Sequence, residues 1–406
     1  MKIMHINAVY GVGSTGIIVE DLHNLALSKG IESHVVYSTS PISAEKIING
    51  YKVDSFISKK VHAVLCRIGG KQGYFSHYDT KKLIKHIDKV KPDIIHLHNL
   101  HSNYINVNML CEYIADNNIS TVITLHDCWF FTGGCFYYEN ANCTKWLDGC
   151  GNCPKRYLEI PAYIKDCSTK ILADRRKYVG NIKDLTAVGV SNWIADEARK
   201  SFLGKKNVCT IYNGIDTDWF VNTPSDFREK YGLQDKFVIL GAANKWLKPE
   251  NSETLNYVTE NLPEDCALVI IGCIKDDKEK LPKSVVALDY ITDRDELRKI
   301  YSACDVFANC TREDTLSLIN IEPQLCGTPS VTYDNTGVRE TVDNKCGFSV
   351  PTGDSKAFLE TLLKVKENGK AKYSADCVEW AKTKFDRNKN YELYIDLYNS
   401  IANKGE

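Results

Sequence analysis

The sequence predicts an α/β protein that contains two doubly wound parallel sheets, one in each half of the chain. The first observation is that apolar runs of strand length alternate with segments of helix length, the pattern of parallel strands joined by helices. The second is that this pattern stops at a turn-rich stretch and then starts again. The third is the length, since 406 residues suffice for two domains of about 200 residues each.

The strands expected in the first half lie in KIMHIN, SHVVYS, DIIHLH, TVITLH, TAVGV and NVCTIYN. Those expected in the second half lie in FVILGAAN, CALVIIGC, SVVALDY, CDVFANC and TPSVTYD. Between them, Asn213-Gly214 and the stretch IDTDWFVNTPSD predict a linker with a boundary near Phe220. We therefore expect one domain over residues 1–219 and a second over residues 220–385.

The last segment, residues 386–406, predicts a helix packed on a domain surface. Its apolar residues lie at helical spacings, which is typical of an amphipathic helix. They are Tyr391, Leu393, Tyr394, Leu397 and Ile401.

Composition and charge exclude several classes of protein. The net charge is −1, so no overall field attracts nucleic acid or an acidic surface to the whole molecule. No apolar run approaches the roughly 20 residues of a membrane span, and the N-terminus lacks a signal-peptide cleavage pattern. We expect a cytoplasmic protein that binds no nucleic acid.

A glycine-rich turn follows the first expected strand. Gly11, Gly13 and Gly16 form the pattern G-x-G-x-x-G, which in dinucleotide-binding proteins holds a pyrophosphate at a helix N-terminus. Such proteins also need an acid at the end of the second strand, where this chain has Tyr37-Ser-Thr-Ser40. The pattern therefore favours an anion or substrate loop over a nicotinamide site, and a tight turn without a ligand is the alternative.

Two acids, Asp314 and Glu322, lie eight residues apart in TREDTLSLINIEPQLCGTP. If a helix begins at Thr315, Asp314 is its N-cap and Glu322 lies about 12 Å further along the axis. A sugar nucleotide has that length, with hydroxyl groups at both ends and a pyrophosphate that suits a helix N-terminus. A simple cap and a surface carboxylate are the alternatives without a ligand.

The stretch EDTLSLINIEPQLCGTPSVTYD, together with HLHNLH, TLHDCWFFTGGC and CTIYNGID, resembles the retaining glycosyltransferases of family 4, in the capsule, O-antigen and colanic-acid group. The resemblance implies the GT-B fold, with two Rossmann-like domains facing a cleft and a C-terminal helix returning to the first domain. It implies transfer of a hexosyl group from a UDP- or GDP-sugar to a surface polysaccharide acceptor, either a glycan or a polyprenyl-pyrophosphate-linked chain. It also implies that no catalytic metal is needed. A non-catalytic sugar-nucleotide-binding subunit and a sugar-nucleotide epimerase are the alternatives.

In that family two glutamates separated by seven residues bind the donor, and Asp314 and Glu322 occupy their positions. The family's phosphate-binding Arg and Lys align with Lys245 and Glu250, and because Glu250 repels a diphosphate we expect Lys248 to share this role. Pro323 predicts a kink in the helix. Further donor contacts are expected from Gly13, Glu313, Thr315, Leu316 and Ser317.

In the first domain the resemblance places His126, at the end of VITLHDCW, beside the transferred sugar. It also implies that His98, Asn99 and Gly16 lie on the acceptor side. His96, His98 and His101 have an alternate spacing that could bind a metal, but histidines without a neighbouring carboxylate or thiolate more often form hydrogen bonds.

Five cysteines lie in a long loop, about residues 127–160, that is poor in strand and helix signals. The first is Cys128, and the other four are the candidate metal ligands. They are Cys135, Cys143, Cys150 and Cys153, the last two in a C-x-x-C pattern. Four thiolates satisfy a closed structural Zn²⁺ site, and a loop of this length needs a cross-link to hold it in one conformation. An iron–sulfur cluster and unliganded thiols are the alternatives.

Residues 56–86 carry seven Lys or Arg and one acid, Asp79. Basic residues interleaved with apolar ones suit docking on anionic lipid or on a polyprenyl-pyrophosphate acceptor, and solvated helix faces are the alternative. We therefore expect a peripheral contact with the inner face of a membrane.

Overall fold

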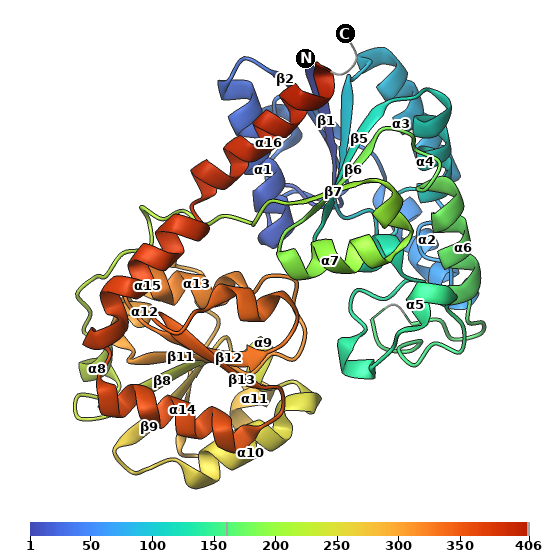
Figure 1. Cartoon of the computed structure of the whole chain (residues 1–406). Helices are drawn as coiled ribbons and strands as arrows, with labels where there is room; N and C mark the ends of the chain where they lie inside the picture. The colour runs from blue at the N-terminus through green and yellow to red at the C-terminus, as the bar shows by residue number, and fades with distance from the viewer. Residues whose placement is uncertain (160, 404–406) are drawn as a thin grey trace. The chain divides into compact units, whose positions relative to one another are not determined.

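The computed structural model describes residues 1–159 and 161–403 and confirms the expected fold class. Ile160, at the end of the expected cysteine-rich loop, and residues 404–406 of the expected terminal helix lie outside the described residues. The chain forms two compact units, whose strands and helices are labelled in Figure 1. The first contains Met1–Ile211 and the chain from Tyr391 onward, and the second contains Tyr212–Asn390.

The first unit is built on a seven-stranded parallel sheet in the order β3-β2-β1-β4-β5-β6-β7. The strands are β1 Lys2–Ile6, β2 Glu32–Tyr37, β3 Gly50–Lys52, β4 Ile94–Leu97, β5 Ser120–Leu125, β6 Leu185–Gly189 and β7 Asn207–Thr210. The helices are α1 Gly13–Ser28, α2 Phe56–Gly69, α3 His77–Val90, α4 Val107–Asp116, α5 Lys145–Asp148, α6 Ser168–Tyr178 and α7 Asn192–Lys200, with short 3-10 helices η1 Ala44–Lys46, η2 Trp129–Phe131, η3 Glu139–Ala141 and η4 Phe202–Lys205. The central strand β4 is buried at every residue, as expected of a parallel sheet covered on both faces.

The second unit is built on a six-stranded parallel sheet in the order β10-β9-β8-β11-β12-β13. The strands are β8 Phe237–Ala242, β9 Cys266–Ile271, β10 Val285–Ala287, β11 Val306–Asn309, β12 Ser330–Asp334 and β13 Gly347–Pro351. The helices are α8 Phe227–Lys230, α9 Ala243–Trp246, α10 Ser252–Asn261, α11 Lys275–Lys280, α12 Arg294–Ala303, α13 Ile321–Leu325, α14 Ser355–Asn368 and α15 Ala371–Lys384, with short 3-10 helices η5 Pro249–Asn251, η6 Leu318–Asn320 and η7 Thr336–Thr341.

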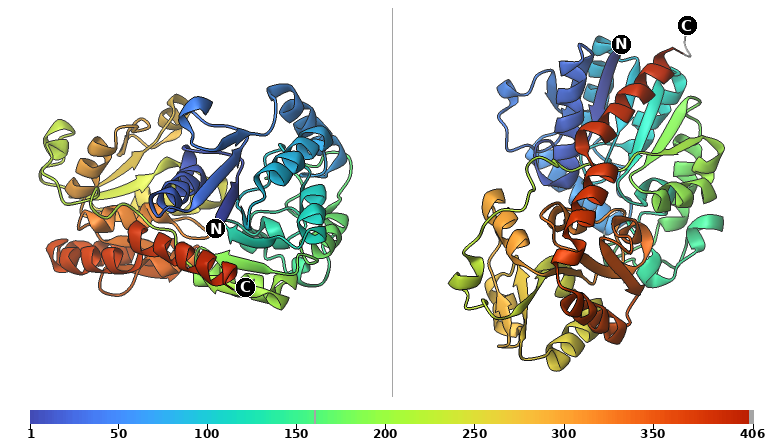
Figure 2. Two further views of the ribbon diagram at one scale, coloured as in Figure 1. Left: turned by 90° about the horizontal axis from the view of Figure 1, so that it is seen from above. Right: turned by 60° about the vertical axis from the view of Figure 1, so that its left-hand side comes forward.

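The terminal helix α16, Arg387–Ala402, returns to the first unit, as the resemblance implied. Figure 2, right, shows this last helix lying across the strands of that unit. Its apolar face packs on β1, β4, β5 and β6, which makes it part of the core of the first unit. The buried residues on this face are Tyr391, Tyr394, Ile395, Tyr398 and Ile401.

The division between the units falls at Ile211 and Tyr212 rather than at Trp219 and Phe220. The reason is that the expected linker pairs with the segment before α16. The Ile215 N–H donates to the Phe385 carbonyl at 2.8 Å, and the Arg387 N–H donates to the Ile215 carbonyl at 3.0 Å. This pairing attaches the start of the turn-rich stretch to the second unit.

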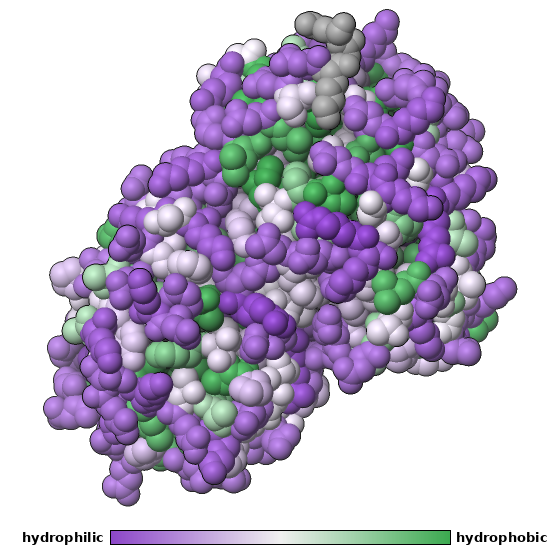
Figure 3. All heavy atoms as spheres, viewed as in Figure 1, coloured by the Kyte–Doolittle hydropathy of each residue, from purple (hydrophilic) through white to green (hydrophobic). Residues whose placement is uncertain are grey.

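Charged and polar residues cover most of the face shown in Figure 3, and apolar residues appear there in small groups. None of the helices in the described part of the chain is both long enough and apolar enough to cross a bilayer.

Candidate functional site

The second unit has a pocket of about 350 Å³ where β8 and β9 end. The carboxyl ends of parallel strands are where open α/β sheets bind ligands. Ile271, Ile291 and Leu297 give the pocket an apolar wall, and Glu322 gives it a carboxylate. This composition suits a ligand that has one flat apolar part and a pair of hydroxyl groups.

Glu322 is held in place by Tyr301 of α12. The Tyr301 hydroxyl donates to Glu322 Oε2 at 2.9 Å, and both residues line the pocket. Burial raises the pKa of Glu322, while the hydrogen bond from Tyr301 and the charge of Arg294 act in the opposite direction. The structure thus places the predicted donor-binding acid in a pocket wall.

The helix expected to begin at Thr315 begins later, so this prediction is wrong. The chain from Asp314 to Ser317 is irregular, η6 follows, and α13 begins only at Ile321. Asp314 is therefore not an N-cap, and the axial distance expected between Asp314 and Glu322 does not apply. Pro323 lies in the first turn of α13, where its missing N–H is tolerated. The predicted kink is therefore absent, because no helical turn precedes Pro323 in α13.

Asp314 instead forms an ion pair with Lys245, whose Nζ lies 2.8 Å from Asp314 Oδ2. Lys245 belongs to α9, which is anchored by the buried Trp246 through an N–H bond to the Ala308 carbonyl at 2.8 Å. A Cβ at Gly241 would lie 2.2 Å from the indole nitrogen, so only glycine allows this packing. The pair is intact in this structure, and its carboxylate neutralises the cation that was expected to contact phosphate.

A second cation, Arg312, reaches the same loop and was missed from sequence. Its Nε donates to Asn251 Oδ1 at 3.1 Å, and Asn251 Nδ2 donates to the Lys245 carbonyl at 2.8 Å. Lys248 immediately precedes η5, which contains Glu250. A basic residue three positions after the end of β11, at the ligand-binding edge of the sheet, is the signal that could have identified Arg312.

Asn309, the last residue of β11, holds the irregular segment that follows it through two side-chain hydrogen bonds. Its Nδ2 donates to Ser317 Oγ at 3.0 Å and to Asn320 Oδ1 at 2.7 Å. Thr315, Leu316 and Ser317 are buried, whereas Glu313 is half-buried. The segment is therefore a shaped loop with restricted freedom, as a ligand-contacting loop requires.

In the first unit the predicted residues gather where β1, β4 and β5 end. His126 follows β5, His98 and Asn99 follow β4, and Gly13 begins α1 after β1. The Asn99 N–H donates to Asn7 Oδ1 at 3.0 Å, which ties the ends of β1 and β4 together. Asn7 was not predicted from sequence.

His98 does not line a surface, contrary to the expected acceptor-side role. Its side chain is fully buried, and its Nδ1 lies 3.1 Å from His126 Nε2. Asn99 is half-buried and retains some exposed surface. His101 lies apart from His96 and His98 and pairs with Asp127, with 3.0 Å between Nε2 and Oδ2.

The glycine turn is shaped by close contacts. Gly11 and Gly13 have positive φ angles of 69° and 64°, and the Gly11 N–H donates to the Gly16 carbonyl at 3.0 Å. A Cβ at Gly16 would lie 3.1 Å from Val9 Cγ2, so glycine brings α1 against the turn. Val12, which precedes α1, supplies no capping side chain to the N–H groups of the first turn.

The four candidate ligands Cys135, Cys143, Cys150 and Cys153 are free thiols, and each lies close enough to at least two of the others for the charge of one to affect the pKa of the other. Burial raises the pKa of Cys150 to about 11, and the nearby Cys143 and Cys153 act in the same direction. A Cβ at Gly133 would lie 2.8 Å from Cys150 Sγ, so the loop closes tightly around this thiol. Among the described residues, no three of these sulfur atoms lie within 4.8 Å of one another.

Solved structures define the fold class. Sucrose-phosphate synthase from Thermosynechococcus elongatus superposes with a TM-score of 0.69 at 14% identity, covering 98% of each chain. Anabaena HepE, solved in complex with UDP-glucose, superposes with a TM-score of 0.64 at 14% identity, covering 98% of this chain and 100% of that one. The two parallel-sheet units are those of the GT-B glycosyltransferases.

Sequence comparison gives the family. Residues 15–219 match the model described as Glycosyltransferase Family 4, and residues 216–368 match the model described as Glycosyl transferases group 1. The chain belongs to glycosyltransferase family 4. WcaC of Escherichia coli (strain K12), named as a colanic acid biosynthesis glycosyl transferase, is 23% identical over 421 residues, which cover 99% of this chain and 100% of WcaC.

Proposed function

We propose that this glycosyltransferase moves a hexosyl group from a nucleotide sugar to a lipid-linked surface polysaccharide, with retention at the anomeric carbon. The observation that carries the proposal is the pocket beside Glu322, which has an apolar wall for a base and a carboxylate for ribose hydroxyls. The similarity to WcaC supports a polysaccharide acceptor. The complex of HepE with UDP-glucose supports a UDP-sugar as the donor.

In this proposal the departing diphosphate is stabilised by Lys245, Lys248 and Arg312, together with N–H groups of the loop from Thr315 to Ser317. Such fixed cations and dipoles stabilise developing charge in place of a metal ion. The acceptor hydroxyl attacks from the face that the diphosphate leaves. His126 contacts the transferred sugar as a neutral imidazole, because burial lowers its pKa to about 4.

The test is a panel of nucleotide sugars in thermal-shift measurements, followed by a transfer assay with a polyprenyl-pyrophosphate-linked acceptor. We expect one donor class to stabilise the protein and to be consumed only when acceptor is present. Binding without any transfer would favour a non-catalytic subunit. Epimerisation of the donor sugar without acceptor would favour an epimerase.

Replacing Lys248 with Ala should lower the transfer rate at least about tenfold, the equivalent of roughly 1.4 kcal/mol in the barrier. The reason is that the Asp314 carboxylate offsets part of the charge of Lys245, so Lys248 and Arg312 supply most of the positive charge near the diphosphate. Glu250→Lys is the matched change on the same loop and should leave donor binding equal or better. An unchanged rate in Lys248→Ala would exclude Lys248 from the phosphate site.

The acceptor side is proposed to dock on anionic lipid through α2. Of its fourteen residues only His62 and Cys66 are buried, while Phe56 and Ile57 are 72% and 73% exposed. Lys60 lies over the Phe56 ring at 4.3 Å, so cationic and apolar groups share one surface. This combination matches the boundary between anionic headgroups and acyl chains.

Flotation with vesicles should show binding to anionic phosphatidylglycerol vesicles and little binding to phosphatidylcholine vesicles. Phe56→Ser combined with Ile57→Ser should reduce this binding about tenfold or more, because each buried side chain contributes roughly 1.5–3 kcal/mol. Ile48→Ser, at a site that is 61% exposed on the same unit but outside α2, is the control. Equal loss in both variants would argue against α2 as the docking surface.

The thiol-rich loop is proposed to bind one structural Zn²⁺ through Cys135, Cys143, Cys150 and Cys153. The chain between β5 and α6 forms only short helical turns among its described residues, and a metal bound by four thiolates would cross-link it. Protein purified without metal affinity should contain about one equivalent of zinc. Cys150→Ser should lose it and Cys266→Ser, at a buried thiol of the second unit, should keep it. Metal-free wild type that is fully folded would contradict the proposal.

A further inference from the structure

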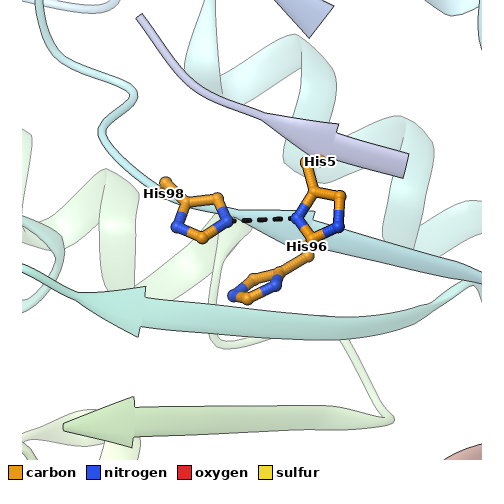
Figure 4. A group of neighbouring side chains, drawn as sticks. All are labelled: His5, His96 and His98. Carbon is orange, nitrogen blue, oxygen red and sulfur yellow. Dashed lines mark hydrogen bonds between the residues drawn. The ribbon is translucent and has the colours of Figure 1, made fainter. Parts of the chain in front are cut away.

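Three buried imidazoles of the first unit form a continuous row from β1 to the end of β5. His5 Nδ1 lies 3.4 Å from His98 Nε2, and His98 Nδ1 lies 3.1 Å from His126 Nε2. Figure 4 shows the contact between His5 on β1 and His98, with His96 beside them. The row exists because β1 and β4 pair in parallel with His5 opposite His96. This register places His5 beside the end of β4, where His98 follows.

The three rings are neutral at neutral pH. Burial lowers the pKa of His5 to about 3 and that of His126 to about 4, and it holds the pKa of His98 well below its usual range. The charge of Asp127 acts in the opposite direction on His126, but burial dominates. A neutral imidazole has one N–H and one bare nitrogen, so each contact in the row uses one donor and one acceptor.

Only two arrangements of protons satisfy both contacts, because the nitrogen that carries the proton in one ring determines which nitrogen carries it in the other two. In the first, His126 donates to His98 and His98 donates to His5, which leaves the Nε2–H of His5 buried. In the second, His5 donates to His98 and His98 donates to His126, which leaves a bare nitrogen at His5 Nε2. His5 Nε2 has no hydrogen-bond partner among the described residues, and a buried N–H without an acceptor is less tolerated than a buried bare nitrogen.

We propose that His98 is a positioning residue that donates its Nδ1–H to His126 Nε2 and thereby holds His126 in the Nδ1–H tautomer. This inference rests on the proposed function only in assigning His126 to the transferred sugar. In this tautomer His126 Nε2 accepts from His98, so the ring contacts the sugar as a hydrogen-bond donor through its Nδ1–H. His98 acts through His126, since its own side chain is fully buried.

A metal ion is the competing explanation for the same cluster. One nitrogen from each of His5, His96 and His98 lies within 4.8 Å of the others. However, His96 already uses both ring nitrogens, at 2.6 Å from the Tyr398 hydroxyl and 2.7 Å from Thr124 Oγ1. Coordination would break one of these short bonds, so the hydrogen-bonded row accounts for the cluster without an ion.

Side-chain ¹⁵N NMR of protein labelled at histidine tests the tautomer directly and needs no turnover. Wild type should show His126 protonated at Nδ1, with the signal assigned by its loss in His126→Gln. His98→Leu removes the donor and should change the tautomer of His126 or make it a mixture. His98→Asn places an amide N–H near the position of Nδ1 and should restore the wild-type signal.

The kinetic readout separates positioning from folding. His98→Leu should lower kcat about tenfold with little change in KM, and His98→Asn should recover most of it. His23→Leu is the matched control, because His23 is equally buried and bonds through both ring nitrogens to Ser33 and Ile48. It should lower the melting temperature without altering the tautomer of His126.

Three results would overturn the inference. They are an Nε2-protonated His126 in wild type, an unchanged His126 signal in His98→Leu, and the loss of one metal equivalent in His98→Leu. If wild type transfers no sugar but shows the expected tautomer, the proposed function fails and the hydrogen-bonded row stands.

Discussion

Replacing Glu322 with Ala is expected to weaken nucleotide-sugar binding about tenfold to a hundredfold. The carboxylate lines the pocket and would accept hydrogen bonds from two ribose hydroxyls, and charge-assisted bonds of this kind contribute roughly 1.5–3 kcal/mol. The variant also leaves the Tyr301 hydroxyl without its acceptor. Isothermal titration with the donor found in the panel measures the change.

Two further variants make this result specific. Glu322→Gln keeps the shape of the side chain and removes the charge, so its affinity should lie between wild type and Glu322→Ala. Glu360→Ala, at an exposed site in the same unit, should bind as wild type does. A folded Glu322→Ala protein with unchanged affinity would show that the pocket beside β8 and β9 does not hold the ribose.

The second large effect is expected on acidification, because the first unit keeps several histidines neutral. Unfolded histidines take up protons below about pH 6.5, whereas the buried ones do not until the pH is much lower. Stability is therefore unaffected above this window and falls as the pH drops through it. The described histidines whose pKa is lowered by burial are His5, His23, His62, His86, His96, His98 and His126.

Each fully buried histidine costs on the order of 2 kcal/mol of unfolding free energy between pH 6.5 and 5. The four in contact around His98 therefore remove a large part of the roughly 5–15 kcal/mol that stabilises a typical domain. Urea unfolding across this range should show a steep loss of stability. His5→Leu should have a shallower pH slope than wild type, whatever its stability at pH 8. Identical slopes would contradict the account.

The sequence was sufficient to predict two parallel sheets, because strand-length apolar runs separated by helices leave few other architectures. It missed two strands at the edges of the sheets, β3 and β13, whose sequences GYK and GFSVP carry no long apolar run. The resemblance pointed to Glu322, and the structure places this side chain in the wall of a pocket; its role in donor binding stays a prediction. The start of α13 was not predictable, because buried side-chain bonds from Asn309 hold the preceding segment out of a helix. Helix propensity along the chain contains no information about such tertiary hydrogen bonds.

Other parts of the site depend on contacts between distant residues. The ion pair of Lys245 with Asp314 joins segments after β8 and β11, and only the strand order brings them together. His5 joined the histidine cluster through the register of β1 on β4, which places it opposite His96. A motif read along the chain contains neither the strand order nor the register.

The return of α16 to the first unit has a consequence for how the protein is made. The second unit, Tyr212–Asn390, is a continuous stretch inserted into the first, which needs residues from Tyr391 onward to cover its sheet. During synthesis the inserted unit is therefore whole before the earlier one, reversing the usual order in which domains fold from the N-terminus. Until the last helix emerges from the ribosome, the face of the first unit's sheet that α16 covers stays exposed to solvent.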